Sequence, residues 1–333
     1  MSNYPFCTIN PNVGVVEVPD PRLFDIQRII GSPKTIPTVI EFFDIAGLVK
    51  GAHKGEGLGN QFLSNIREVD AIAHVVRCFK SEEIAHVSGE VDPKRDIETI
   101  NIELCLADLL LVDKKLETVK AKAKAGDKKF TAEALFLQKI RDLLNAEKPA
   151  RSINIGEIEK GFLNELPLLT LKPVIYVTNV DESGNKDKVE VVKKIAESEG
   201  ARTVSISAKL ESEIAELSAE DAKAYLAEVG LEEAGLKRLI RSGYELLELT
   251  TFFTANEKEA RAWTVKRGTL VPQAAGKVHS DMEHGFIAAE VIHYNDLHAC
   301  GSVAKAREKG VFHIEGKHYA VQDGDLVLVR FKA

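Results

Sequence analysis

The chain has 333 residues, of which 44% are hydrophobic and 29% are charged, and it carries a formal net charge of −7. This length suits about two or three domains, and the composition excludes an intrinsically disordered chain. The acidic balance also excludes a protein that is basic throughout, so any contact with RNA requires a local patch of positive charge.

Short apolar runs in the first two thirds of the sequence are typical of buried strands. They cover residues 39–46, 71–79, 173–178 and 203–206. These runs are apolar on both faces and are separated by helical stretches, which is the pattern of a mostly parallel α/β sheet. The sequence therefore predicts an α/β domain.

Between about residues 96 and 148 the hydrophobic spacing becomes helical, with lysines and acids on the other faces. A break at residues 125–127 divides this stretch, so we expect two amphipathic helices joined by a glycine turn. Because this hairpin interrupts the α/β pattern, we interpret it as an insertion. Further helices are predicted at residues 187–199, 211–228 and 233–247.

After residue 249 strand-like runs dominate, at residues 262–265, 285–292 and 326–331. Turn sequences such as Gln322-Asp323-Gly324-Asp325 separate them. The pattern indicates a small, separate β-rich domain at the C-terminus.

The strongest chemical motif, Asp44-Ile45-Ala46-Gly47-Leu48, directly follows the first apolar run. In phosphate-hydrolysing switch proteins an Asp at this point supports Mg²⁺, and the Gly lets a backbone N–H approach the γ-phosphate. Four glycines within residues 50–60 would make the following loop adaptable. A lone D-x-x-G, however, is more often an ordinary strand end with a turn glycine.

Two further turns follow later apolar runs, where parallel sheets place their ligand loops. The first begins Asn179-Val180 and departs from the guanine-reading pattern Asn-Lys-x-Asp, because Val180 and Glu182 replace the Lys and the Asp. The second, Ser207-Ala208-Lys209, could offer backbone N–H groups to a base. Each alone is weak, and a surface turn is the alternative. Thr8, in a proline-punctuated loop, is either a Mg²⁺ ligand or a plain surface residue.

Taken together and in this order, the motifs resemble those of Obg-class nucleotide hydrolases, and specifically the YchF/Obg-like ATPase family. The resemblance runs from end to end of the chain. It rests on residues 3–9, 20–23, 44–60, 74–79, 261–264 and 321–325.

The resemblance implies a P-loop NTPase-type sheet with an inserted helical hairpin and a C-terminal β-grasp domain of the TGS type. The nucleotide-binding domain would comprise residues 1–95 and 168–248, the hairpin residues 96–167, and the TGS domain residues 249–333. It also implies ATP as the substrate in preference to GTP, with Mg²⁺ as cofactor.

The resemblance further implies roles for individual residues. Thr8 and Asp44 would bind Mg²⁺, and Asp44 to Leu48 would contact the γ-phosphate. The base would be surrounded by Phe79, Asn179, Val180, Ser207 and Ala208. Leu48 stands where many related hydrolases have a Gln that orients the attacking water. The family's alternative is a histidine, which His86 matches, although His86 could equally be a surface loop residue.

The family's phosphate-binding loop, Gly-x-x-x-x-Gly-Lys-Ser/Thr, does not occur in the sequence. We therefore expect a chain truncated before residue 1, with apolar surface exposed on neighbouring elements. Such a chain is predicted to bind ATP weakly, to hydrolyse it very slowly and to have reduced stability.

By resemblance, the partner would be the ribosome or another part of the translation machinery. Lysines gather near the expected hairpin tip, at Lys114, Lys115, Lys120, Lys122, Lys124, Lys128 and Lys129. They could contact RNA phosphates or form an ordinary solvated face. The alternative functions are a non-catalytic interaction protein that uses the hairpin and the TGS domain, and an Obg-class GTPase, which Val180 and Glu182 disfavour.

The first residues have no basic flank or apolar run of the signal-peptide kind, and no stretch approaches ~18 uninterrupted apolar residues. The four cysteines are scattered, with no CxxC pair. We therefore expect a cytoplasmic protein without a membrane partner.

Overall fold

The computed structural model describes residues 12–45, 58–81, 89–124, 127–163, 165–181 and 184–332. They belong to two compact units, each of which is described by itself. The first unit comprises the residues up to Val13 together with Phe43–Gly243, and the second comprises Gly14–Phe42 together with Tyr244–Ala333. The chain therefore passes between the units after Val13, after Phe42 and after Gly243.

The first unit is built on a parallel three-stranded sheet in the order β4-β5-β6. Its strands are β4 (Ile72–Arg77), β5 (Val174–Asn179) and β6 (Arg202–Ile206). The central strand β5 is buried on both faces, which explains its continuous apolar sequence. Strand β4 is an edge strand of this described sheet, and Val75 on it is 63% exposed.

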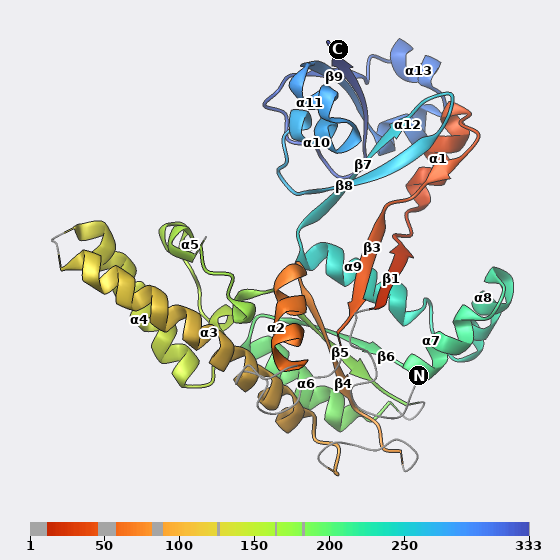
Figure 1. Ribbon diagram of the computed structural model, residues 1–333. Coiled ribbons are helices and arrows are strands. Elements are labelled where there is room, and N and C mark those ends of the chain that lie inside the picture. The colour runs from red at the N-terminus through yellow and green to blue at the C-terminus, as the bar shows by residue number, and fades with distance from the viewer. Residues whose placement is uncertain are drawn as a thin grey trace. The chain divides into compact units, whose positions relative to one another are not determined.

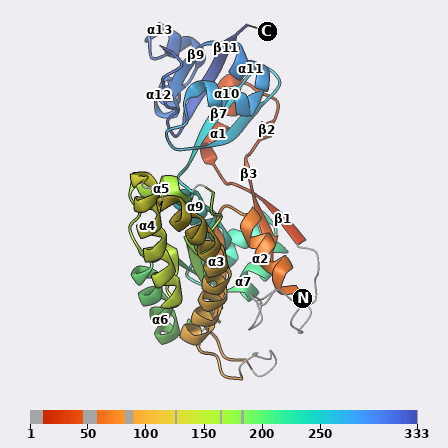
Figure 2. The ribbon, with the colours of Figure 1, turned by 60° about the vertical axis from the view of Figure 1, so that its left-hand side comes forward.

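The predicted helical hairpin is confirmed. It consists of α3 (Pro93–Ala123) and α4 (Lys128–Asn145), which lie side by side in Figures 1 and 2. Asp92 and Asp127 cap the two helices by accepting backbone N–H bonds. A continuous core joins the helices, and it includes Val112, Leu116, Phe136, Leu137, Ile140 and Leu144. Short elements then return the chain to the sheet, namely η2 (Ala150–Ser152), α5 (Glu157–Leu163) and η3 (Leu169–Leu171).

The first unit has further helices, namely α2 (Leu58–Glu68), α6 (Lys186–Ser198), α7 (Ala208–Ala215), α8 (Ala219–Glu228) and α9 (Gly235–Leu246). Of these, α6 packs on the sheet, and α7, α8 and α9 come after its last strand in the sequence. The single helix predicted at residues 211–228 is thus wrong, because Ser218 caps a new helix at that point by accepting the Asp221 N–H. Within the described ranges, no helix has the length and apolar composition needed to cross a membrane.

The second unit contains a six-stranded sheet in the order β10-β9-β11-β7-β8-β2. Its C-terminal strands are β7 (Leu249–Ala255), β8 (Ala260–Lys266), β9 (Phe286–His293), β10 (His313–Glu315) and β11 (Asp325–Phe331). Between them lie α10 (Val271–Val278), α11 (Ser280–His284), α12 (Tyr294–Cys300) and α13 (Val303–Glu308). Alternate residues of these strands point to opposite faces of the sheet and pack into two hydrophobic cores. Ile292 and Leu326 belong to one core, and Val291 and Val327 belong to the other.

An N-terminal segment completes this second unit. It contains α1 (Pro21–Ile30), β2 (Thr35–Ile36) and the greater part of β1 (Asn12–Glu17) and β3 (Val39–Asp44), whose outer ends belong to the first unit. The sequence led us to place residues 14–42 in the nucleotide-binding domain and residues 39–46 in the parallel sheet. The structure shows a different pairing of these strands. Strand β3 pairs with β1 in a two-stranded sheet, and β2 pairs with β8.

The physical reason for this difference is the burial of α1. Its residues Leu23 and Ile26 are 1% and 0% exposed, and they pack among residues of the C-terminal strands and helices. Local signals for this helix were present in the sequence, since Asp20 caps it, Pro21 is its first residue, and Gly31 ends it with a φ of 80°. No local sequence pattern predicted which surface this helix would pack against.

Candidate functional site

The ends of the three parallel strands lie in register at one edge of the first unit's sheet. Arg77 is opposite Asn179, and Asn179 is opposite Ile206. Backbone hydrogen bonds continue this register past the strands, from Cys78 N–H to the Asn179 carbonyl at 2.8 Å and from Val180 N–H to the Ile206 carbonyl at 2.9 Å. The loops that follow β4, β5 and β6 therefore start together, as ligand loops of parallel sheets do.

Asn179 links two of these loops directly. Its side-chain Oδ1 accepts a hydrogen bond from the backbone N–H of Ala208, at 3.1 Å. Ser207, one residue earlier, is the N-cap of α7 and accepts the N–H of Leu210. Behind them the hydroxyl of Thr178 donates to that of Ser205 at 2.8 Å. The Asn-Val and Ser-Ala-Lys turns thus form one hydrogen-bonded structure.

Phe79 stands at the same edge, after β4, and is held by Arg77. The Arg77 guanidinium carbon lies 4.7 Å from the centroid of the Phe79 ring. The same side chain donates to the carbonyls of Phe79 and Ser81, each at 3.2 Å. Arg77 therefore fixes both the ring and the backbone of this loop. The sequence reasoning missed this role, although the Arg-Cys-Phe spacing already placed both residues at the strand end.

A second layer of residues supports the turn at Ser207. Glu211 on α7 accepts the backbone N–H groups of Gly235 at 2.6 Å and Leu236 at 3.1 Å, at the start of α9. A Cβ on Gly235 would lie 2.9 Å from the Glu211 carboxylate and 3.0 Å from Ile206, so only glycine fits without displacement. Arg238 donates to the carbonyl of Ser205 at 2.8 Å. None of these three residues was predicted.

Two titratable groups at β4, Cys78 and His74, are neutral at physiological pH. Burial raises the pKa of the Cys78 thiol to about 11, against the opposing charge of Lys188. Burial, together with the nearby charge of Arg151, lowers the pKa of His74 to about 4. Neither group is therefore suited to nucleophilic or acid–base chemistry at neutral pH.

The remaining predicted residues are only partly covered by the structure. Asp44 is the last residue of β3, and its side chain is exposed. Ile45 packs against the cluster of α2, α3 and η3 that contains Leu63, Leu104 and Leu169. The other predicted positions lie outside the described residues, namely Thr8, Ala46, Gly47, Leu48 and His86.

The described residues contain no group of three or more His, Cys, Asp or Glu side chains able to hold a metal ion. The carboxylate of Asp44 is exposed, and a carboxylate is a ligand type that Mg²⁺ accepts. Magnesium sites at nucleotides use one or two carboxylate or hydroxyl ligands together with phosphates and water, so such a cluster is not required.

Comparisons with known proteins match this architecture over nearly the whole chain. The Ribosome-binding ATPase YchF of Bacillus subtilis (strain 168) is 52% identical over 336 residues, which cover 99% of this chain and 92% of the relative. The protein of the same name from Escherichia coli O157:H7 is 50% identical over 328 residues, covering 98% and 90%. The chain belongs to the YchF family.

Other comparisons agree with this membership of the YchF family. A family model for the YchF GTPase C-terminal region, described as a protein of unknown function, matches residues 249–332. A model described as 50S ribosome-binding GTPase matches residues 1–115. The solved "Structure of the Schizosaccharomyces pombe YchF GTPase" is 36% identical and superposes with a TM-score of 0.85, over 99% of this chain and 90% of that one. The mixed α/β fold is therefore confirmed for this YchF-family chain.

Proposed function

We propose that this YchF-family chain is an ATP-binding and ATP-hydrolysing switch protein that acts on the ribosome in the cytoplasm. One observation carries the proposal: the loops after β4, β5 and β6 begin at one sheet edge, and the hydrogen bond from Ala208 N–H to Asn179 Oδ1 ties the loops after β5 and β6 together. The names of the relatives support the reaction and the ribosome as partner, because they are described as ribosome-binding ATPases.

The base would bind among Phe79, Asn179, Val180, Ser207 and Ala208. The Phe79 ring, held by Arg77, offers a face for stacking. Val180 and Glu182 replace the Lys and the Asp of the guanine-reading pattern. In that pattern the Asp accepts hydrogen bonds from N1–H and the 2-amino group of guanine, and adenine has no 2-amino group. These substitutions favour adenine over guanine.

The phosphates would extend toward Asp44 and the glycine that follows it at residue 47. Mg²⁺, held by Asp44 and Thr8, would neutralise charge on the β- and γ-phosphates. Because Leu48 cannot hydrogen-bond a water, His86 is our proposed residue for orienting the attacking water. Thr8, Asp44, Gly47 and His86 provide separate positions for testing phosphate binding and catalysis.

The adenine site is best tested by a method that also detects weak binding. Saturation-transfer NMR on the full chain should give stronger saturation of the base protons of ATP than of GTP, and Asn179→Ala should reduce the ATP signal. Asn295→Ala, an exposed asparagine of the second unit, is the matched control. Equal signals for the two nucleotides, or no effect of Asn179→Ala, would contradict adenine recognition at this edge.

We further propose that the hairpin tip contacts ribosomal RNA. Lys115 of α3 already has a partner, because its ammonium nitrogen lies 2.6 Å from the carboxylate of Glu165. Lys124, Lys128 and Lys129 are exposed, and their side chains form no hydrogen bond or ion pair with another described residue. A flexible cation without an internal partner is free to bind a phosphate, so these three residues are the ones we assign to RNA.

Sedimentation with ribosomal subunits tests this contact. The triple Lys→Gln variant at positions 124, 128 and 129 should bind more weakly, and its affinity should depend less on salt, by roughly 0.7–0.9 in the log–log slope for each lost contact. The control is Lys→Gln at the exposed positions 193, 194 and 237, which changes the net charge equally. An equal loss of ribosome affinity in both variants would show that net charge, and not a specific RNA-binding surface at the hairpin tip, determines the binding.

A GTPase is the second candidate, because the fission-yeast relative is titled a GTPase. A third candidate is a non-catalytic interaction protein that uses the hairpin and the C-terminal domain. The nucleotide comparison separates all three, since a GTPase would favour GTP and an interaction protein would bind neither nucleotide while still sedimenting with ribosomes.

A further inference from the structure

We propose that residues 14–42 couple the C-terminal domain to the two loops assigned to the phosphates, and that a network around Arg22 holds this segment in place. The assignment of those loops rests on the proposed function. The coupling itself rests on contacts within the second unit and on the order of the chain.

The first observation is that α1 is part of the hydrophobic core of the C-terminal domain. Leu23 and Ile26 are almost completely buried, and they share a cluster with Phe253 of β7 and Ile292 of β9. Without α1, these large C-terminal side chains would lose part of their cover. The domain matched at residues 249–332 is thus completed by a helix from the other end of the chain.

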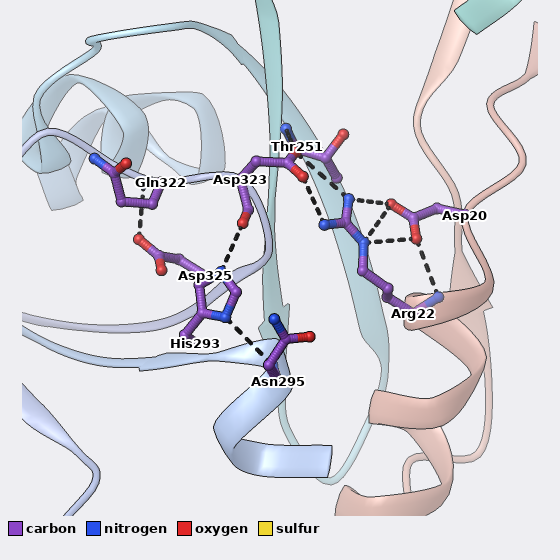
Figure 3. A network of polar contacts seen from close by, with 8 residues as sticks. All are labelled: Asp20, Arg22, Thr251, His293, Asn295, Gln322, Asp323 and Asp325. Carbon is purple, nitrogen blue, oxygen red and sulfur yellow. Dashed lines mark hydrogen bonds and ion pairs between the residues drawn. The ribbon is translucent and has the colours of Figure 1, made fainter. Parts of the chain in front are cut away.

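The second observation is the polar network shown in Figure 3. Arg22 on α1 lies 2.7 Å from the carboxylate of Asp20 and 2.6 Å from that of Asp323 in the β10–β11 loop. Its guanidinium also lies over the Phe253 ring, 5.4 Å from the centroid. Asp323 is anchored in turn by the Thr251 N–H at 3.1 Å. Arg22 thereby joins the two family motifs Asp-Pro-Arg-Leu and Val-Gln-Asp-Gly-Asp.

Gly324 is the position at which this network leaves least space. Its φ is +92°, and a Cβ there would lie 3.0 Å from a terminal nitrogen of Arg22. Its N–H and carbonyl also bond to Thr251 and Tyr294, each at 2.9 Å. A side chain at this position would therefore strain the turn and displace Arg22 together.

The far end of the segment is fastened independently. The Ser32 hydroxyl donates to the carbonyl of Asn256 at 2.7 Å, and the Ala260 N–H donates to the carbonyl of Lys34 at 3.0 Å. Strand β2 then extends the sheet beside β8. The Thr38 and Thr264 hydroxyls lie 2.7 Å apart. Residues 20–38 are consequently held to the C-terminal domain at both ends.

The order of elements along the chain connects this segment to the proposed phosphate contacts. Strand β1 begins shortly after Thr8, strand β3 ends at Asp44, and the two strands pair with each other. Each proposed phosphate contact is thus joined through one short strand to a segment that folds with the C-terminal domain. A displacement of either loop must be transmitted to that segment or absorbed by these strands, which is the physical basis for linkage between two sites.

Hydrogen exchange of the full chain, followed by mass spectrometry without nucleotide, tests the coupling. In the parent protein, amides of α1 should open with the same free energy as those of β7 and β9. Arg22→Ala and Gly324→Ala should each speed exchange in α1, β1 and β3 by roughly tenfold, because charge-assisted hydrogen bonds are lost. Exchange in β5 of the first unit should not change.

Arg28→Ala is the matched control, since Arg28 is on the same helix, is 76% exposed and, among the residues that the structure describes, pairs only with Asp25 on the preceding turn. Arg22→Lys keeps the charge and provides a milder variant should Arg22→Ala not fold. The proposal is overturned if α1 opens independently of β7 and β9, or if Arg22→Ala affects α1 and leaves β1 and β3 unchanged.

Adding ATP and Mg²⁺ to the same samples separates this inference from the proposed function. ATP should slow exchange in α1 of the parent protein, and Arg22→Ala should abolish that response while ATP still binds. If ATP fails to bind, the proposed function fails, whereas the nucleotide-free exchange still decides the coupling.

Discussion

Arg151 and Glu199 form a buried ion pair in the first unit, with an N–O distance of 2.8 Å and side chains that are 8% and 9% exposed. Arg151 lies in η2, after the hairpin, and Glu199 follows α6. Asn101 of α3 and Tyr176 of β5 complete the network by donating to Glu199 at 2.9 and 2.8 Å. The inserted hairpin is therefore tied to the sheet through polar groups whose hydrogen bonds are satisfied.

Removing one member should destabilise the protein strongly, because the other charge is left buried without a partner. We expect Glu199→Ala to lower the free energy of unfolding by about 3–5 kcal/mol. Urea unfolding followed by circular dichroism measures this change. Glu197→Ala, an exposed position two residues earlier, is the control. A loss below about 1 kcal/mol would mean that water replaces the network at little cost.

Asp108 provides a second buried connection, between the hairpin and the short helix η3 that precedes β5. Its carboxylate is 0% exposed and accepts the backbone N–H groups of Leu169 and Thr170, each at 2.8 Å, and the Thr170 hydroxyl at 2.6 Å. Asp108→Asn replaces one acceptor by a donor that faces other donors, so we expect a loss of about 2–3 kcal/mol. Asp113→Asn, at an exposed ion pair with Arg141, should cost at most about 1 kcal/mol.

The pH dependence of stability should carry a contribution from His74. Burial, with the charge of Arg151, lowers its pKa from 6.5 to about 4. Between these values the unfolded chain binds the proton and the folded chain does not, so stability is complete above pH 6.5 and falls as the pH drops toward 4. Thermal unfolding at pH 7.5 and pH 5 should show a smaller fall for His74→Gln than for the parent.

The difference should be on the order of 1–2 kcal/mol, and His318→Gln, at an exposed position, is the control. Parallel pH curves for His74→Gln and the parent would show that folding does not lower the pKa of His74.

Arg77 and Phe79 should act together on nucleotide affinity. Phe79→Ala should weaken ATP binding by roughly tenfold through the loss of stacking. Arg77→Ala should weaken it less, and the double variant should resemble Phe79→Ala, because Arg77 acts through the ring it holds. Arg261→Ala is the control, since Arg261 lies over Trp263 in the second unit, 4.1 Å from the ring centroid. Additive losses would instead indicate that Arg77 contacts the nucleotide itself.

The sequence alone predicted the features that depend on local pattern. Strand β5 is a largely apolar run that cannot be exposed on both faces, and the 3-4 spacing of α3 and α4 indicates helices with one buried side. Because the carboxyl ends of parallel strands share an edge, placing Phe79, Asn179 and Ser207 after such strands was enough to bring them together.

Only the tertiary structure decided the features that depend on distant partners. Asp20, Pro21 and Gly31 mark a helix, but nothing local states that Leu23 will pack against Phe253, or that Arg22 will meet Asp323. In the same way, the sequence gives no sign that Asp108 of α3 and Glu199 after α6 are buried. Each becomes buried beside a distant partner, Thr170 for Asp108 and Arg151 for Glu199. Patterning determines which face of an element avoids water, whereas the choice of the surface that covers it depends on the packing of the whole chain.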